Sequence, residues 1–137
     1  MTRVIITGGR DYPPFQRNRE IAFLDALHEK HHFSEVITGG ARGADRYADA
    51  WAESCKINRV IFPANWEGEG KAAGPKRNQR MIEYLVEKAP PAGLRQRPLK
   101  KAVIGFNGGR GTEHMIGLGV QYGVEIFWYN GEKYGNV

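Results

Sequence analysis

The segment "VITGGARGAD" (residues 36–45) is an apolar run that stops at two glycines and is followed by an arginine and an acid. The same order of apolar residues, Thr or Asn, Gly-Gly and Arg returns in "VIITGGRD" (4–11) and in "VIGFNGGRGTE" (103–113). A short β-branched run that ends at glycines is typical of a buried strand entering a turn. The three segments therefore predict three strands, each followed by a glycine-rich loop.

Amphipathic helices are expected between these strands. The clearest is 44–55, where small and aromatic residues recur at helical spacing and place Cys55 on the packed face and Asp45 off it. The full expectation is strands at 4–7, 36–38, 59–62, 102–106 and 124–129, and helices at 15–30, 44–55, 77–88 and 112–122. This alternation predicts one α/β domain over residues 1–137, a three-layer Rossmann-like domain with a mainly parallel five-stranded sheet and helices on both faces.

Three further segments carry no strong periodicity. Residues 63–75 are polar and rich in glycine, and we expect a mobile loop that closes over a bound ligand. Residues 89–99 hold three prolines and are expected to be an irregular connection, and 130–137 is expected to be a tail.

Composition narrows the class of protein. The net charge of +5 favours an anionic partner, either a nucleotide or a nucleic acid. The single Cys55 allows no internal disulfide, which favours a reducing, cytoplasmic setting. The sequence shows no signal peptide and no apolar run of membrane-spanning length, so no membrane partner is expected.

The glycine-arginine loops are expected to meet in space. Parallel strands end at one edge of a sheet, and ligands bind in the crevice outside that edge. Glycine lets a ligand approach the backbone, a helix N-terminus attracts an anion, and arginine matches phosphate geometry. For any single loop, a tight turn explains the glycines as well as a binding role does. The threefold repetition with arginine favours one shared pocket for an anion. Its expected lining is Gly8, Gly9, Arg10, Gly39, Gly40, Arg42, Gly43, Asp45, Gly108, Gly109, Arg110, Gly111 and Thr112.

Other common site motifs are absent from the sequence. There is no G-x-x-x-x-G-K-[ST] phosphate loop and no clean G-x-G-x-x-G after the first strand. The histidines do not have metal-ligand spacing, and His114 is interpreted as structural or solvated. We therefore expect no metal site and no cofactor.

Four blocks in order resemble the YspA-type branch of the SLOG superfamily. They are "VIITGGRDY" (4–12), "VITGGARGADRYADAWA" (36–52), "FPANWEGEGKAAGPKRNQRMI" (62–82) and "GGRGTEHMI" (108–116). The superfamily also includes the Lonely Guy phosphoribohydrolases, the lysine-decarboxylase-like proteins and the nucleotide-binding-like domain of DprA. The resemblance implies a Rossmann-like domain that binds a nucleotide or a nucleotide-derived ligand, and relatives that are often homo-oligomers.

The resemblance also implies residue roles. The block from Gly108 to Thr112 is similar to the phosphate-holding motif of the Lonely Guy enzymes, and Arg77 matches their catalytic arginine, with Asn78 where they have lysine. Glu113 is the matching candidate acid, but it directly follows Thr112, and a shift of one residue turns a helical side chain by about 100°. We therefore expect ligand binding, as sensor or carrier, more than N-glycosidic hydrolysis.

Two alternatives stay open at this point. Asp45 either caps its helix or contacts a ribose hydroxyl, and it is a second candidate acid-base for a nucleoside 5′-monophosphate phosphoribohydrolase. The rival function is single-stranded nucleic-acid binding, for which Trp51, Trp66 and Trp128 are the available aromatic residues. Of these, only Trp66 is expected to be exposed.

Overall fold

The computed structural model describes residues 1–87, 100–130 and 134–136. Within these ranges, six strands form one sheet in the order β3-β2-β1-β4-β5-β6, and the first five are parallel. The strands are β1 (Thr2–Thr7), β2 (Phe33–Thr38), β3 (Asn58–Ile61), β4 (Lys100–Phe106), β5 (Glu125–Tyr129) and β6 (Tyr134–Asn136). The longer helices are α1 (Ala22–His31), α2 (Ala44–Ser54), α4 (Ala73–Val86) and α5 (Arg110–Gln121). The predicted Rossmann-like architecture is confirmed.

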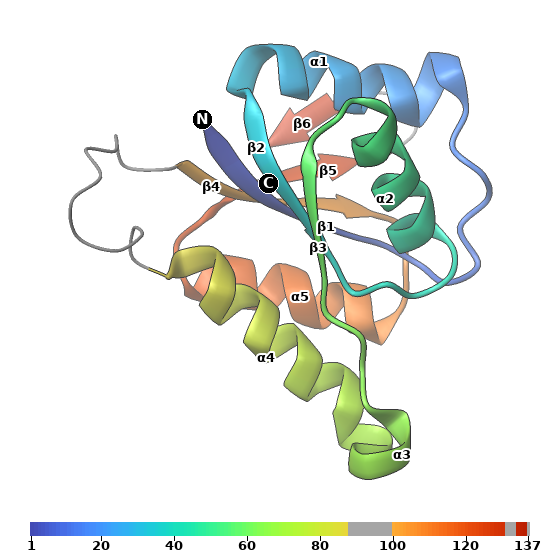
Figure 1. Ribbon diagram of the computed structural model, residues 1–137, viewed down its shortest axis with the longest axis vertical. Helices are drawn as coiled ribbons and strands as arrows, with labels where there is room; N and C mark the ends of the chain where they lie inside the picture. Colours follow the sequence, from blue (N-terminus) through green and yellow to red (C-terminus); the bar gives the residue numbers. More distant parts are fainter. Residues whose placement is uncertain (88–99, 131–133, 137) are drawn as a thin grey trace.

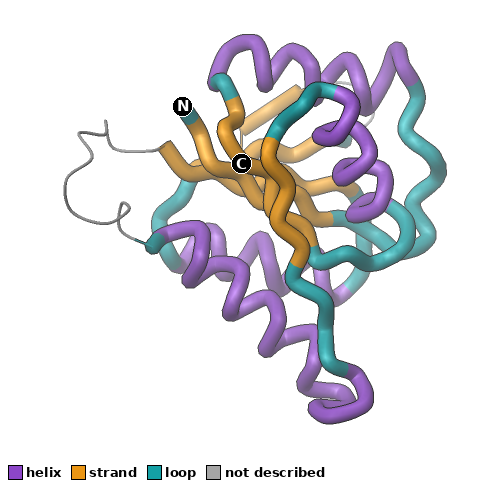
Figure 2. Tube along the Cα trace, in the orientation of Figure 1, coloured by secondary structure: helices purple, strands orange, loops and turns teal. Residues whose placement is uncertain are grey.

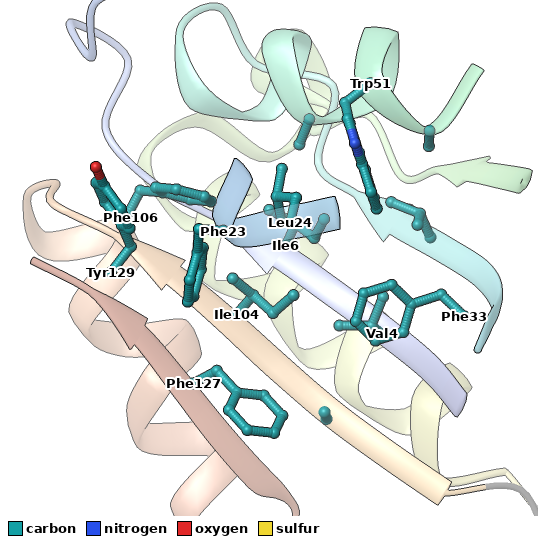
Figure 3. Close-up of a cluster of buried hydrophobic side chains, with 14 of the residues drawn as sticks. Val4, Ile6, Phe23, Leu24, Phe33, Trp51, Ile104, Phe106, Phe127 and Tyr129 are labelled. Carbon is teal, nitrogen blue, oxygen red and sulfur yellow. The ribbon is translucent and has the colours of Figure 1, made fainter. Parts of the chain in front are cut away.

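Helices cover both faces of the sheet, with α1 and α2 on one side and α4 and α5 on the other (Figures 1 and 2). Successive side chains of a strand point to opposite faces. Val4 and Ile6 therefore pack into the core under α1 and α2, while Ile5 packs into the core over α4 and α5. Figure 3 shows the first of these cores, where Phe23 and Trp51 close over the sheet.

Helix α2 follows the predicted stripe, with one difference. Trp51 is buried and Cys55 packs against the core, as the spacing predicts. Asp45, however, is only 6% exposed, so its predicted place off the packed face is wrong. The first turn of α2 lies next to the carboxyl end of β2, and there the Asp45 side chain packs against Gly39 and is shielded from water.

The segment 63–75 is largely helical, so the predicted open loop is wrong. A short helix α3 (Trp66–Glu69) is followed by the 3₁₀ turn η2 (Gly70–Ala72), and α4 begins at Ala73 instead of residue 77. Asn65 caps α3 by accepting a hydrogen bond from the N–H of Gly68 at 3.0 Å. Ala73 is fully buried and anchors this end of α4.

Two other segments differ in detail. The predicted first helix begins as a π-helical turn, η1 (Arg17–Ile21), before α1. Within the predicted tail, Tyr134–Asn136 forms β6, which pairs antiparallel with β5. The predicted irregular connection at 89–99 lies outside the described residues.

The strand order places a crevice between β1 and β4. The chain runs outward from β1 through β2 to β3, then crosses back to β4 on the other side of β1. This reversal is the position at which open α/β sheets bind ligands, outside the carboxyl ends of the strands. The ends of β1 and β4 are joined there by the N–H of Gly9, which donates to the carbonyl of Asn107 at 2.9 Å.

Candidate functional site

A cavity of about 720 Å³ lies at this carboxyl edge of the sheet. Its size is within the range of small-molecule sites. Its walls come from the loops after β1 and β2, from α3 and the start of α4, and from the first turn of α5. The lining residues are Thr7, Gly8, Gly9, Arg10, Asp11, Gly39, Ala41, Asp45, Trp66, Lys71, Gly74, Pro75, Arg77, Asn78, Met81, Gly109, Arg110, Gly111, Thr112 and His114.

The first turn of α5 opens into this cavity. Gly109 is the N-cap residue of α5. Its carbonyl accepts the first hydrogen bond of the helix, which the N–H of Glu113 donates. The N–H groups of Arg110, Gly111 and Thr112 therefore have no partner within the helix. A Cβ added at Gly109 or Gly111 would have no neighbour within 4 Å, so the space around this turn is open.

The loop between β2 and α2 is filled by the protein itself. Gly43 has a φ of +76°, and a side chain there would collide with the carbonyls of Gly9 and Arg10. The N–H of Ala44, in the first turn of α2, already donates to the carbonyl of Gly9 at 3.0 Å. This loop therefore packs against the loop after β1, which occupies the space beside Gly43 and the N–H group of Ala44.

Arg42 does not join the other two arginines of the repeated motif. Its side chain is 67% exposed and pairs with Asp11 at 3.1 Å. It lines a neighbouring hollow of about 320 Å³, together with Gly40 and Arg10, and it does not line the large cavity, which Arg10 and Arg110 do. The cations around the large cavity are Arg10, Lys71, Arg77 and Arg110.

Arg77 is buried and holds two strand ends together. Its Nη1 donates to the carbonyls of Gly39 at 2.8 Å and Phe62 at 3.3 Å, and its Nε donates to Oδ1 of Asn78 at 3.0 Å. Burial lowers the pKa of the guanidinium. Of the three guanidinium nitrogens, Nη2 alone lacks a hydrogen-bond partner among the described residues, so this atom is available to a ligand.

Asp45 is the buried carboxyl group of the site. Burial raises its pKa from the ordinary 3.8 to about 6, against the opposing effects of a hydrogen bond from the N–H of Ala41 and the positive charge of Arg77. The desolvation of the carboxylate outweighs the nearby charge. A carboxyl group with such a pKa exchanges a proton near neutral pH, which suits an acid-base role as well as a hydrogen bond to a sugar hydroxyl.

Asn78 connects α4 to α5. Its Oδ1 accepts from Arg77, which can only donate, so its Nδ2 must be the donor toward the carbonyl of Gly111 at 3.2 Å and Nδ1 of His114 at 3.1 Å. In this network the Nδ1 atom of His114 has the acceptor role. His114 was expected to be structural or solvated, yet it lines the cavity.

The remaining predicted site residues have other positions. Glu113 is exposed and is not among the cavity-lining residues, because it points away from the face of α5 that carries Thr112 and His114. Gly8 lines the cavity and is also packed against Ala44, whereas Gly108 is packed against Thr112 and Gly9 and does not line the cavity. Lys71 and Trp66 line the cavity; neither was predicted individually as a ligand contact, although their segment was expected to close over a ligand.

Other kinds of site find little support in the described part of the chain. No group of three His, Cys, Asp or Glu side chains there could hold a metal ion. Trp51 is buried and Trp128 half-buried, which leaves Trp66 as the exposed tryptophan. No helix in these residues is both long and apolar enough to cross a membrane.

Comparisons with known proteins agree with the resemblance of the sequence blocks. The "Gene 61 protein" of Mycobacterium phage D29 is 39% identical over 87 residues, which cover 60% of this chain and 69% of the phage protein. No solved structure matches the chain. Residues 2–68, which include the loops after β1 and β2, match the family described as "YspA, cpYpsA-related SLOG family". The chain belongs to this YspA, cpYpsA-related SLOG family.

Proposed function

We propose that the cavity binds a nucleoside 5′-phosphate or a closely related nucleotide, with its phosphoryl group at the first turn of α5. Membership of the SLOG family suggests a nucleotide-related ligand in general. The observation that carries the finer proposal is the open N-terminus of α5, where unpaired N–H groups adjoin free space next to Gly109 and Gly111. Helix N-termini of this kind are favourable sites for phosphate.

The charges around the cavity support this position for the phosphoryl group. Arg110 belongs to the same turn, and Arg10 and Lys71 belong to the facing walls. Asp45 belongs to α2, which follows β2 across β1 from β4 and α5, and its carboxyl group disfavours a phosphate and suits the hydroxyl groups of a sugar. The ligand is therefore oriented with its phosphate toward α5 and its ribose toward α2.

Calorimetric titration with AMP tests the proposal. Arg110→Ala should weaken AMP binding by at least about tenfold, the loss expected for a charge-assisted hydrogen bond of roughly 1.5–3 kcal/mol. Arg46→Ala is the matched control, because Arg46 is an exposed arginine of α2 that does not line the cavity. Equal affinities in the two variants would contradict the proposal. Native mass spectrometry of the purified protein should also detect a co-purified nucleotide.

A second candidate function, hydrolysis of the N-glycosidic bond, is favoured by the position of Asp45. A carboxyl group with a pKa of about 6, placed beside the sugar, can accept a proton from an attacking water. The bond between ribose and base would break, releasing free base and ribose 5-phosphate in equal amounts. Chromatography after incubation with AMP measures this release. Asp45→Asn should abolish it and Glu113→Gln should not, whereas a wild-type protein that releases no base is a binding protein only.

A further inference from the structure

Trp66 is an exposed aromatic side chain on a firmly held support. It is 48% exposed and belongs to α3, whose start is capped by Asn65. At the end of α3, the carboxylate of Glu69 accepts hydrogen bonds from Arg80 at 2.9 and 3.1 Å. It also pairs with Lys76 at 3.7 Å. Both cations belong to α4, so the short helix is fixed to the long one and the indole has a defined place.

The indole lies at the mouth of the cavity. Trp66 lines both the large cavity and the neighbouring hollow, and its helix α3 follows β3, which lies across β1 from β4, the strand that leads into α5. Its ring edge lies over Gly74, where an added Cβ would come within 3.4 Å of the indole. One face of the ring is covered by the guanidinium of Arg10, whose Cζ is 5.0 Å from the ring centroid. A large aromatic face is thus held beside the cavity and covered by a single cation, Arg10.

We propose that Trp66 is the platform on which the base of the ligand stacks, so that the site selects base-bearing nucleotides over sugar phosphates. This inference rests on the proposed function, because the phosphate at α5 and the ribose at Asp45 direct the rest of the ligand toward the mouth. Stacking on an aromatic side chain tolerates any base, since every base has a π-face. The platform therefore recognises an aromatic base without choosing among bases.

Arg10 makes stacking of a base on Trp66 depend on the presence of the phosphate. At 5.0 Å from the ring, the guanidinium occupies the place that a stacked base needs. A cation–π contact at an exposed site is weak, whereas a charge-assisted bond from arginine to phosphate is strong. Arg10 also lines the large cavity beside Gly9. When the phosphoryl group binds, Arg10 moves from the ring to the phosphate and frees the face for the base.

The test compares AMP with ribose 5-phosphate by calorimetric titration of the wild type and of Trp66→Leu. AMP should bind the wild type about tenfold or more tightly than ribose 5-phosphate does, because the base adds stacking. Trp66→Leu should remove most of that difference and should keep the affinity for ribose 5-phosphate within about twofold of the wild type. Trp66→Phe should show a preference for AMP between those of the wild type and Trp66→Leu. Tyr122→Leu is the matched control, since Tyr122 is an exposed aromatic residue at the far end of α5.

The outcomes separate the two proposals. If both ligands bind the wild type equally, or if Trp66→Leu weakens both to the same extent, the base does not stack on Trp66 and this inference is overturned while the phosphate site stands. If neither ligand binds, the proposed function fails, and the inference falls with it. Melting temperatures of the variants, compared with the wild type, verify that each one is folded before it is titrated.

Discussion

Helices α2 and α5 begin in the same way and do different work. Each follows a parallel strand, and each is preceded by a glycine that provides no side-chain cap, Gly43 for α2 and Gly109 for α5. At α2, Gly43 packs against the backbone carbonyls of Gly9 and Arg10 in the loop after β1, and Asp45 is buried in the first helical turn. At α5 the space around Gly109 is empty.

This difference shows that a repeated motif need not have a repeated role. The copy after β2 is used to pack two loops together and to hold a buried acid. The copy after β4 leaves its N–H groups and its arginine facing the cavity. Whether a Gly-Gly-Arg loop binds a ligand thus depends on what the neighbouring loops place in front of it. Four experiments can break or sharpen the comparison.

The largest effect is expected from alanine at the two glycines that precede the helices. Gly43→Ala should lower the free energy of unfolding by at least about 3 kcal/mol, because φ is +76° and the new side chain would meet backbone carbonyls. Gly109→Ala should cost only about 0.5–1 kcal/mol while weakening AMP binding. Urea titrations of both variants measure the costs. Similar losses of stability would mean that α5 is as tightly packed as α2.

The second effect depends on pH and on Asp45. Its folded-state pKa of about 6 exceeds the ordinary 3.8, so the native state favours the protonated carboxyl group. The associated stability is fully present below about pH 4 and is lost as the pH rises through about 6. Relative to Asp45→Asn, the wild type should lose roughly 3 kcal/mol between pH 4 and pH 8. Urea titrations at several pH values check this, and the control Glu113→Gln, which keeps Asp45 and alters an exposed acid of α5, should lose stability between pH 4 and pH 8 as the wild type does.

A smaller effect with two opposite signs is expected at Gly111. Gly111→Ala should raise the free energy of unfolding by up to about 1 kcal/mol, because alanine favours the helix. The same methyl group would enter the proposed phosphate space and weaken AMP binding about tenfold. Gly117→Ala, in the same helix and also in open space, should give the stabilisation alone. Unchanged AMP affinity in Gly111→Ala would place the phosphate elsewhere.

The smallest effect is expected at Arg42. From the sequence, Arg42→Ala is expected to weaken nucleotide binding by roughly 1.5–3 kcal/mol, the range for a charge-assisted hydrogen bond, and to leave the melting temperature nearly unchanged. The structure changes this expectation, because Arg42 is exposed and its ion pair with Asp11 is worth at most about 1 kcal/mol. We now expect AMP affinity and stability to stay within about 0.5 kcal/mol of the wild type. A tenfold loss of affinity on titration would show that the β2 loop reaches the ligand after all.

The order of strands and helices could be predicted from the sequence because local signals agree with the fold. Apolar runs that end at Gly-Gly marked β1, β2 and β4, short apolar runs marked β3 and β5, and the helical spacing of α2 marked its packed face. The helix α3 could not be predicted, since its four residues are held by Glu69 through contacts to Arg80 and Lys76. The strand β6 likewise depends on its partner β5 rather than on its own sequence.

The candidate site was predictable only in outline. The glycines and arginines of the β1 and β4 loops were identified, since strand ends converge in any parallel sheet. The burial of Asp45 was missed, because an acid in the first turn of a helix is usually exposed. The link from Asn78 to His114 joins two helices that are far apart in sequence, and no local pattern carries it.

The position of the cavity between β1 and β4 has a consequence for folding kinetics. Ile5 of β1 pairs with Val103 of β4, about 100 residues later in the chain, and such distant pairings form slowly. Pairing of β1 with β2 closes a much shorter loop and leaves the crevice without its second wall. The completed anion site therefore requires this long-range pairing, and a refolding chain should regain ligand binding no earlier than β4 joins β1.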